Sequence, residues 1–339
     1  MSLTRYIFRR LLLQVFVLVG VSSLTFFMMI VMPGDPSTIL LETTGGISTE
    51  AVEKFRERWG FDKPAYLQYF TFMGNLVRGD FGESFVTRRE ISAELGSFLP
   101  ATAELSIVAF LMAVIMAIPA GILAAVKRNA LPDHIVRIVS LFGTSMPIFW
   151  FAIILLLVFF FYLGWVPSSQ RIGMTLDVPQ TVTGFYTIDT LIAGDFEGFV
   201  SALHHLALPA FVLAFSVVGL LARVTRTSML EVMGEDYIRM AHAKGLHNRV
   251  VLYRHALRNA LIPTVTILGL LVGGLLSGAV LTETIFAWPG LGRFAVQSIF
   301  FLDRAAVTSV ALIIGVAYST ATLIVDIIVA VLDPRITYT

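Results

Sequence analysis

The sequence predicts an all-α protein that crosses a membrane six times, and three observations lead to this prediction. Of the 339 residues, 57% are hydrophobic and 14% are charged, and the mean hydropathy is +0.83, which is a membrane composition. Six apolar runs are long enough to span a bilayer. The short polar stretches between them differ in their content of Lys and Arg, as in a multi-pass membrane protein. We therefore expect one polytopic membrane domain.

The first apolar run, residues 11–32, follows Arg5, Arg9 and Arg10 and contains no charge. It is longer than the apolar core of a signal peptide and has no cleavage site of the A-x-A type, so we expect residues 1–32 to form an uncleaved first span. Pro33 and Pro36 then end the helix. Residues 33–99 are polar, with an amphipathic patch at 52–59, and we expect a loop outside the membrane that contains short helices.

The remaining residues, 100–339, are expected to form a core with five spans, at about 101–126, 138–163, 202–222, 261–281 and 306–331. The segments 127–137 and 222–260 carry three and seven Lys or Arg residues, whereas 164–203 and 284–305 carry one and two. Because basic loops stay in the cytoplasm, both termini are predicted to be cytoplasmic. The 33–99 loop carries seven basic residues, but loops longer than about 60 residues translocate largely regardless of charge.

The loop 223–260 contains an amphipathic segment that begins at Glu235 and Asp236, where acids favour a helix N-terminus. Gly245 interrupts the pattern, and a glycine there readily ends a helix in the left-handed conformation. Apolar residues at helical spacing predict one apolar helix face before Gly245 and a second one after it. These residues are Tyr237, Ile238, Ala241 and Leu246, and then Val250, Tyr253, Leu257 and Leu261. Arg254 and Arg258 stand on a different face, so the segment is either a solvated basic loop or a surface that binds a partner.

The segment resembles the cytoplasmic coupling loop of bacterial ABC-importer permeases. Ala241, Gly245 and Leu257 match the general pattern, whereas Arg239, Met240 and Arg258 depart from it. The departures resemble the dipeptide and oligopeptide branch, of the dipeptide permease B type, which reads DYIRxAxAKG followed by RHALRNALxP. Residues 236–245 and 254–263 fit that branch nearly throughout. So do PGDP at 33–36, SMPIFW at 145–150, TETIF at 282–286, WPGLGR at 288–293 and DPR at 333–335.

The resemblance implies a type I importer permease of six transmembrane helices in the bacterial inner membrane, with residues 33–99 in the periplasm. It also implies three kinds of protein partner: a second homologous permease, two ABC ATPase subunits and a periplasmic peptide-binding protein. ATP and Mg would bind to the ATPase subunits, so no cofactor and no nucleic acid are expected on this chain. The implied ATPase-coupling residues are Glu235, Asp236, Tyr237, Ala241, Ala243, Gly245, Arg254 and Leu257.

The sequence contains no motif that predicts catalysis by this chain. The ATP-binding pattern G-x-x-x-x-G-K-[ST] and the hydrolase patterns H-E-x-x-H and G-x-S-x-G do not occur. The absence of cysteine excludes disulfides, thiolate metal sites and cysteine nucleophiles. Two other classes stay open, a secondary transporter and a membrane enzyme, although only Asp326 interrupts a span. Within the resembling family the cargo could instead be nickel, glutathione, haem or a peptide antibiotic.

Two pairs of residues in the spans are candidates for the gate or the transport path. Met146 and Pro147 predict either a simple kink or a gating hinge. Gly269 and Gly273, followed by Gly274 and Gly278, permit close helix contact, either within the bundle or at a subunit seam or translocation wall.

The stretch 282–293 leaves the fifth span on the outer side. Phe286 and Trp288 are expected to pack among the spans, and Pro289, Gly290 and Gly292 to force a turn. With Arg293, the two aromatic residues are candidates for docking the binding protein, and the alternative is a buried structural turn.

A few ionisable residues lie in or near the spans. Asp326 and Glu104 are expected to reach the membrane interface by snorkelling, unless they have a functional role. His204 and His205 are adjacent and cannot share one helix face, so we expect no metal site there.

Overall fold

The computed structural model describes residues 3–31, 63–84, 86–301 and 303–332. In these residues all regular structure is helical, apart from one isolated bridge between Glu83 and Glu90. The helices are α1 (Leu3–Val31), α4 (Ala65–Val77), α5 (Ile91–Val126), α6 (Leu131–Ser145), α7 (Ile148–Leu156), α8 (Tyr186–Ile192), α9 (Phe196–Met233), α10 (Asp236–Ala243), α11 (Asn248–Val250), α12 (Leu257–Ile285), α13 (Leu291–Phe300) and α14 (Arg304–Leu332). Two π-helical turns, η1 (Leu157–Tyr162) and η2 (Val251–Ala256), interrupt this pattern. The all-α prediction is confirmed for the described residues.

Five segments of the described chain are long and apolar enough to cross a membrane, and they lie in α1, α5, α9, α12 with the turns before it, and α14. A sixth span results if α6, α7 and η1 cross together as one bent unit. Helix α5 begins at Ile91 and α9 at Phe196, earlier than the apolar runs. The predicted boundary between residues 99 and 100 therefore lies inside a helix, because polar residues continue α5 beyond its apolar part. The predicted amphipathic patch at 52–59 lies outside the described residues.

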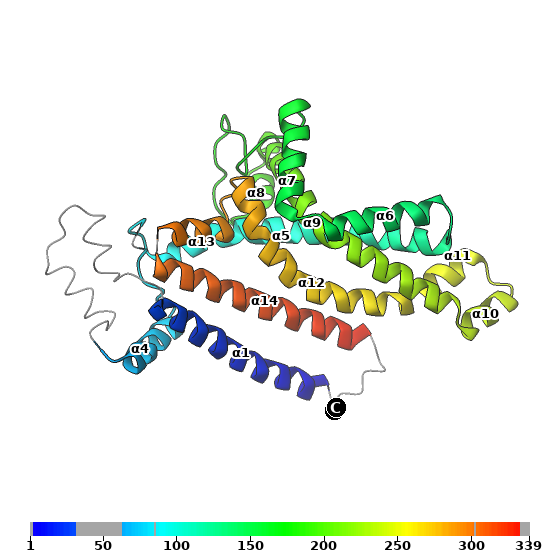
Figure 1. Ribbon diagram of the computed structural model, residues 1–339, viewed down its shortest axis with the longest axis horizontal. Helices are drawn as coiled ribbons and strands as arrows, with labels where there is room; N and C mark the ends of the chain where they lie inside the picture. The colour runs from blue at the N-terminus through cyan, green and yellow to red at the C-terminus, as the bar shows by residue number, and fades with distance from the viewer. Residues whose placement is uncertain (1–2, 32–62, 85, 302, 333–339) are drawn as a thin grey trace.

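The third predicted span, 138–163, is sharply bent. Helices α6 and α7 meet at an angle of 107°, and in Figure 1 α7 stands across the long direction of the other helices. The break falls at Met146, which has an extended backbone with ψ 130°, and at Pro147, which begins the new direction. Proline has no N–H to continue a helix and disfavours the helical conformation of the residue before it. The sequence predicted a kink here, but not its size.

Helices α5 and α9 form the centre of the core. Along α5 a buried residue recurs every four positions, from Ala101 through Ala117, and this row packs against the buried face of α9. Small side chains permit this close approach: a methyl group on Gly121 would lie 2.7 Å from the Ala222 carbonyl oxygen. Helix α12 packs against both, α14 packs on α12, and α1 packs on α14 (Figure 1).

The connections gather at the two ends of the bundle. Helices α10 and α11 lie at one end, and α4 and α13 lie toward the other (Figure 1). The first end carries the segment that resembles a coupling loop, and the second carries the turn after α12. These two ends are the places where a partner protein could reach the chain from either side of a membrane.

Candidate functional site

Helix α10 ends at the glycine corner that the sequence predicted. Gly245 has φ +76°, a conformation in which an L side chain is strained. Its amide donates to the carbonyl of His242 at 2.9 Å, and the amide of Leu246 donates to the carbonyl of Ala241 at 3.3 Å. These two bonds form a Schellman motif, which satisfies the last carbonyl groups of the helix. The prediction of a left-handed cap at Gly245 is confirmed.

The inner face of α10 is fixed to the ends of two long helices. Ile238 and Ala241 are buried in a cluster that includes Ala125 of α5 and Met229 of α9. The hydroxyl of Tyr237 accepts a hydrogen bond from Asn259 Nδ2 at 2.8 Å, which ties α10 to α12. Helix α10 is therefore attached to α5, α9 and α12 near the ends of these helices. The face is narrower than predicted, because Tyr237 and Leu246 are each 39% exposed.

The second half of the segment does not follow the predicted helical face. Val250 and Tyr253, which belong to the predicted apolar face, are exposed, and the buried residues are Val251, Ala256 and Ala260. The cause is η2, since a π turn closes over five residues instead of four and shifts the buried face along the chain. Leu257 is partly buried against the same cluster as α10. The 3.6-residue period used for the prediction fails wherever a π turn inserts a residue.

The outer face of α10 and η2, called here the α10–η2 surface, mixes charge with apolar groups. Its acids lie at the start of α10, where Asp236 pairs with Arg239 at 3.2 Å in an exposed position that contributes little stability. The remaining exposed residues of the surface are Glu235, Met240, Ala243, Lys244, Gly245, Arg249, Tyr253, Arg254 and Arg258. An excess of bases around apolar side chains suits a partner with an acidic rim and an apolar cleft.

At the other end of the bundle, the turn after α12 is folded into the core. Phe286 and Trp288 are each 1% exposed, and the indole N–H of Trp288 donates to the Ala101 carbonyl at 2.9 Å. Ala287 between them has φ +48°, and its carbonyl accepts a bond from Arg293 Nη1 at 2.6 Å. The aromatic residues therefore pack among the spans as expected. In this conformation neither is available to a protein that docks from outside, whereas Arg293 is half-buried.

Glu283 also holds this turn in place, although the sequence analysis assigned it no role. Its carboxylate accepts from the Thr102 hydroxyl at 2.6 Å and from the backbone amide of Arg293 at 3.0 Å. It approaches the chain so closely that a Cβ atom on Gly290 or Gly292 would collide with it. The signal that could have identified it is one acidic residue at the end of a long apolar run.

The other candidates of the spans lie in separate places. Met146 and Pro147 form the break between α6 and α7. A Cβ atom on Gly269 would collide with Val325, and one on Gly273 with Tyr318, so both glycines face α14. The surroundings of Gly274 and Gly278 and the side chain of Asp326 lie outside the described residues.

The two adjacent histidines and Glu104 contact other groups of the chain itself. His204 Nε2 lies 2.5 Å from the Trp165 carbonyl, and His205 Nδ1 lies 2.8 Å from the Ser201 carbonyl. Among the described residues no group of three potential metal ligands occurs. Glu104 does not snorkel to the interface: it is 2% exposed and pairs with Arg171, a residue that the sequence did not single out.

Comparisons with known proteins agree over nearly the whole chain. Residues 117–338 match the family described as binding-protein-dependent transport system inner membrane component, and residues 3–107 match the N-terminal part of such components. The probable D,D-dipeptide transport system permease protein DdpB of Escherichia coli (strain K12) is 45% identical over 95% of this chain and 94% of its own length. The di/tripeptide transport system permease protein DppB of Pseudomonas aeruginosa (strain UCBPP-PA14) is 44% identical over 98% of both chains.

A third relative shows the same agreement. The oligopeptide transport system permease protein AppB of Bacillus subtilis (strain 168) is 39% identical over 98% of this chain and 99% of its own length. This chain therefore belongs to the family of binding-protein-dependent transport system inner membrane components.

Proposed function

We propose that this chain is the permease subunit of an ATP-driven ABC importer that carries dipeptides or oligopeptides across the bacterial inner membrane. The names of its relatives, which are dipeptide, di/tripeptide and oligopeptide permeases, support the peptide cargo. The observation that carries the coupling role is the construction of α10, a short helix with a Schellman cap at Gly245 and a buried inner face. We expect such a helix to stay folded when a docked subunit displaces it.

The coupling residues divide into two groups under this proposal. Asp236, Arg239, Met240 and Arg254 lie on the exposed α10–η2 surface, where an ATPase subunit would dock. Ile238 and Ala241 are buried beneath it and connect α10 to α5 and α9. When ATP and Mg close a pair of ATPase subunits, the docked surface moves with them and the buried cluster passes the movement to the spans. This chain contributes the docking surface and part of the substrate translocation path, and its ATPase partners hydrolyse ATP.

The complete importer would contain this chain, a second homologous permease, two ATPase subunits and a periplasmic peptide-binding protein. In that assembly both termini of this chain are cytoplasmic, and α10 faces the cytoplasm. The binding protein would dock at the opposite end, near α13. Because Phe286 and Trp288 are buried, Arg293 is the docking candidate that retains some exposure.

The glycine corner provides the test of energy coupling. Gly245→Val places a β-branched side chain at φ +76°, whereas Gly245→Asn places there a residue that tolerates the left-handed conformation. In the reconstituted importer we expect the valine variant to lose the stimulation of ATPase activity by loaded binding protein, and the asparagine variant to keep most of it. Undiminished stimulation of Gly245→Val would remove the coupling role. Loading the binding protein with peptide, nickel, glutathione or haem in parallel tests the cargo.

A further inference from the structure

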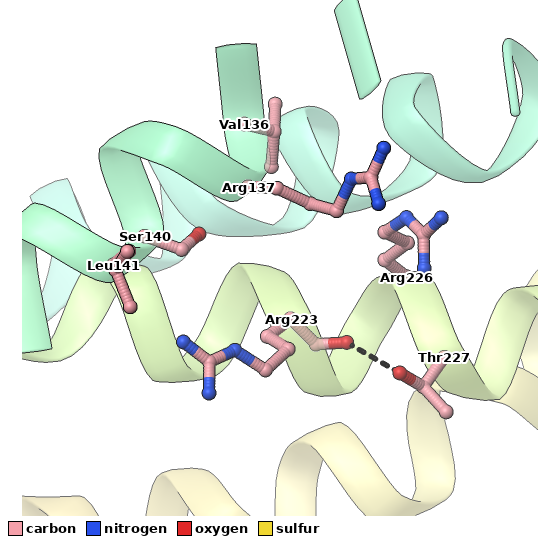
Figure 2. A pocket seen from close by; sticks show the side chains of 7 residues that line it. All are labelled: Val136, Arg137, Ser140, Leu141, Arg223, Arg226 and Thr227. Atoms are coloured by element: carbon pink, nitrogen blue, oxygen red, sulfur yellow. Dashed lines mark hydrogen bonds between the residues drawn. The ribbon is translucent and has the colours of Figure 1, made fainter. Parts of the chain in front are cut away.

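A pocket of about 450 Å³ lies between α6 and α9, toward the end of the bundle that carries α10. It is lined by Val136, Arg137, Ser140, Leu141, Arg223, Arg226 and Thr227 (Figure 2). Helix α6 supplies the first four of these residues and α9 supplies the last three. The pocket does not overlap the α10–η2 surface or the turn after α12.

The pocket has more positive than negative charge. Asp133 is fully buried and accepts two hydrogen bonds from Arg226, at 2.6 and 2.9 Å, and Arg137 Nε lies 3.5 Å from the same carboxylate. One carboxylate thus faces two guanidinium groups. Arg223 adds a third, and within the described residues it has no ion pair. Figure 2 shows its guanidinium group at the opposite side of the pocket from those of Arg137 and Arg226.

The rest of the pocket is apolar and continues onto an apolar helix face. Val136 and Leu141 form part of its wall. Beyond the pocket, Ile138 and Phe142 are exposed on α6 at 56% and 58%. This is the arrangement that an amphiphile needs, with cations for its head group and an apolar surface for its chains.

We propose that this pocket binds the phosphate of an anionic phospholipid of the cytoplasmic leaflet. One guanidinium group can donate two parallel hydrogen bonds to the oxygens of a phosphate. Basic pockets between membrane helices on the cytoplasmic side are suited to lipid head groups. The carboxylate of a peptide would meet the same charges, but it has no use for the apolar face that leads away from them. Arg223 is the residue that the lipid neutralises, because Asp133 already pairs with Arg226.

The test uses the full-length chain with the subunits that accompany it, reconstituted in nanodiscs of phosphatidylcholine alone or mixed with phosphatidylglycerol. Native mass spectrometry counts the lipids retained after extraction, and Tm is measured in both nanodiscs. We expect the unaltered chain to retain phosphatidylglycerol and to gain Tm from it. Arg223→Gln leaves the Asp133 pairing intact and should weaken retention about five-fold, since one basic residue at an anionic surface contributes about 1 kcal/mol. Arg223→Lys should keep most of the retention.

Arg128→Gln is the matched control, because Arg128 is exposed in the turn before α6 and does not line the pocket. It should retain phosphatidylglycerol as the unaltered chain does. Equal retention by Arg223→Gln and the unaltered chain would overturn the proposal, and so would a loss of equal size in Arg128→Gln. Dialanine is added in phosphatidylcholine nanodiscs as a further arm. If it raises Tm and Arg223→Gln abolishes the effect, the pocket is a carboxylate site for cargo and the lipid proposal is wrong.

Discussion

The guanidinium group of Arg171 donates to the carboxylate of Glu104 at 2.5 Å, and both side chains are at least 95% buried. Arg171 comes from the segment between η1 and α8, and Glu104 comes from α5. Arg171 also donates to the Gly184 carbonyl at 2.7 Å and stacks on the Tyr186 ring, 3.7 Å from its centroid. This pair therefore fastens the connection between η1 and α8 to the central helix of the core.

The pair is held on its acidic side by a second set of bonds. Glu104 accepts from the backbone amide of Thr187 at 2.9 Å and from its hydroxyl at 2.6 Å. Buried ion pairs add little net stability, but removal of one partner leaves a charge without compensation in the interior. The two partners should thus respond very differently to single and double substitution.

We expect Arg171→Met to destabilise the chain by about 3–5 kcal/mol, because Glu104 stays buried without its counterion. The double variant Glu104→Gln with Arg171→Met should recover much of this loss, since the amide carbonyl can still accept from Thr187. The measurement is the Tm of each purified full-length variant in the same detergent. A double variant no more stable than Arg171→Met would show that the charge is not the cause.

Asp189 in α8 predicts a dependence of stability on pH. Burial alone would raise the pKa of its carboxyl group. Hydrogen bonds from the Thr183 hydroxyl and from the amides of Thr183, Gly184 and Val182 outweigh burial and lower the pKa below its usual value. A lowered pKa in the folded state means that the ionised group stabilises the fold above the unfolded pKa of about 3.9. This stabilisation is lost as the pH falls through the folded pKa.

Asp189→Asn should therefore lower Tm most near neutral pH, by an amount equivalent to about 1–3 kcal/mol for the unsatisfied donors. The difference from the unaltered chain should narrow below about pH 4 as the native carboxylate takes up its proton. Thermal unfolding across this pH range measures it, with Asp177→Asn, an exposed carboxylate, as the control. A difference that stays constant with pH would contradict the assignment.

Features that depend on local sequence were predictable in this chain. The apolar runs predicted the long helices, because a span needs about 20 apolar residues in sequence. The left-handed cap at Gly245 was predictable, since the pattern before it was helical and glycine reaches φ +76° without strain. The burial of Phe286 and Trp288 was predictable because large aromatic side chains beside a turn are poorly suited to solvent and pack into the core.

Features that depend on distant or irregular contacts were not predictable. Nothing in the composition of the 164–185 segment indicates that Arg171 reaches Glu104 on another element. The π turn at η2 moves burial from Tyr253 to Ala256, and single-residue insertions of this kind leave no mark in a helical period. The size of the bend at Met146 and Pro147 is likewise set by what α7 packs against, which includes α12 and α9.

The orientation of the chain can be tested with single cysteines, because the sequence contains none of its own. Val182 is 65% exposed in the predicted outer connection, and His247 is exposed next to the glycine corner. In intact cells whose outer membrane is permeable to the reagent, an impermeant thiol reagent should label Val182→Cys and leave His247→Cys unlabelled. Both should react after the inner membrane is opened. The reverse pattern would invert the proposed topology.

Trp288 should matter for folding and not for docking. Trp288→Phe keeps most of the buried ring but removes the indole N–H and with it the hydrogen bond to the Ala101 carbonyl. We expect the loss of this hydrogen bond to cost about 0.5–1.5 kcal/mol, seen as a lower Tm and a lower yield of complex. The complex that does form should respond to the binding protein as the unaltered complex does. A weaker response at normal yield would show that the turn takes part in docking through this residue.

Arg293 should show the opposite behaviour. Its backbone amide is bound to Glu283 whatever side chain it carries, and Trp288 fixes the same turn independently, so Arg293→Ala removes mainly the half-exposed guanidinium group. We expect normal yield and basal ATPase activity, and a higher concentration of binding protein for half-maximal stimulation, because a rim charge contributes chiefly to association. Arg293→Lys, which keeps the charge, should restore much of the response. If yield falls and the remaining complex responds normally, the bond to the Ala287 carbonyl is the whole role of Arg293. Unchanged yield with an unchanged titration would eliminate its part in docking.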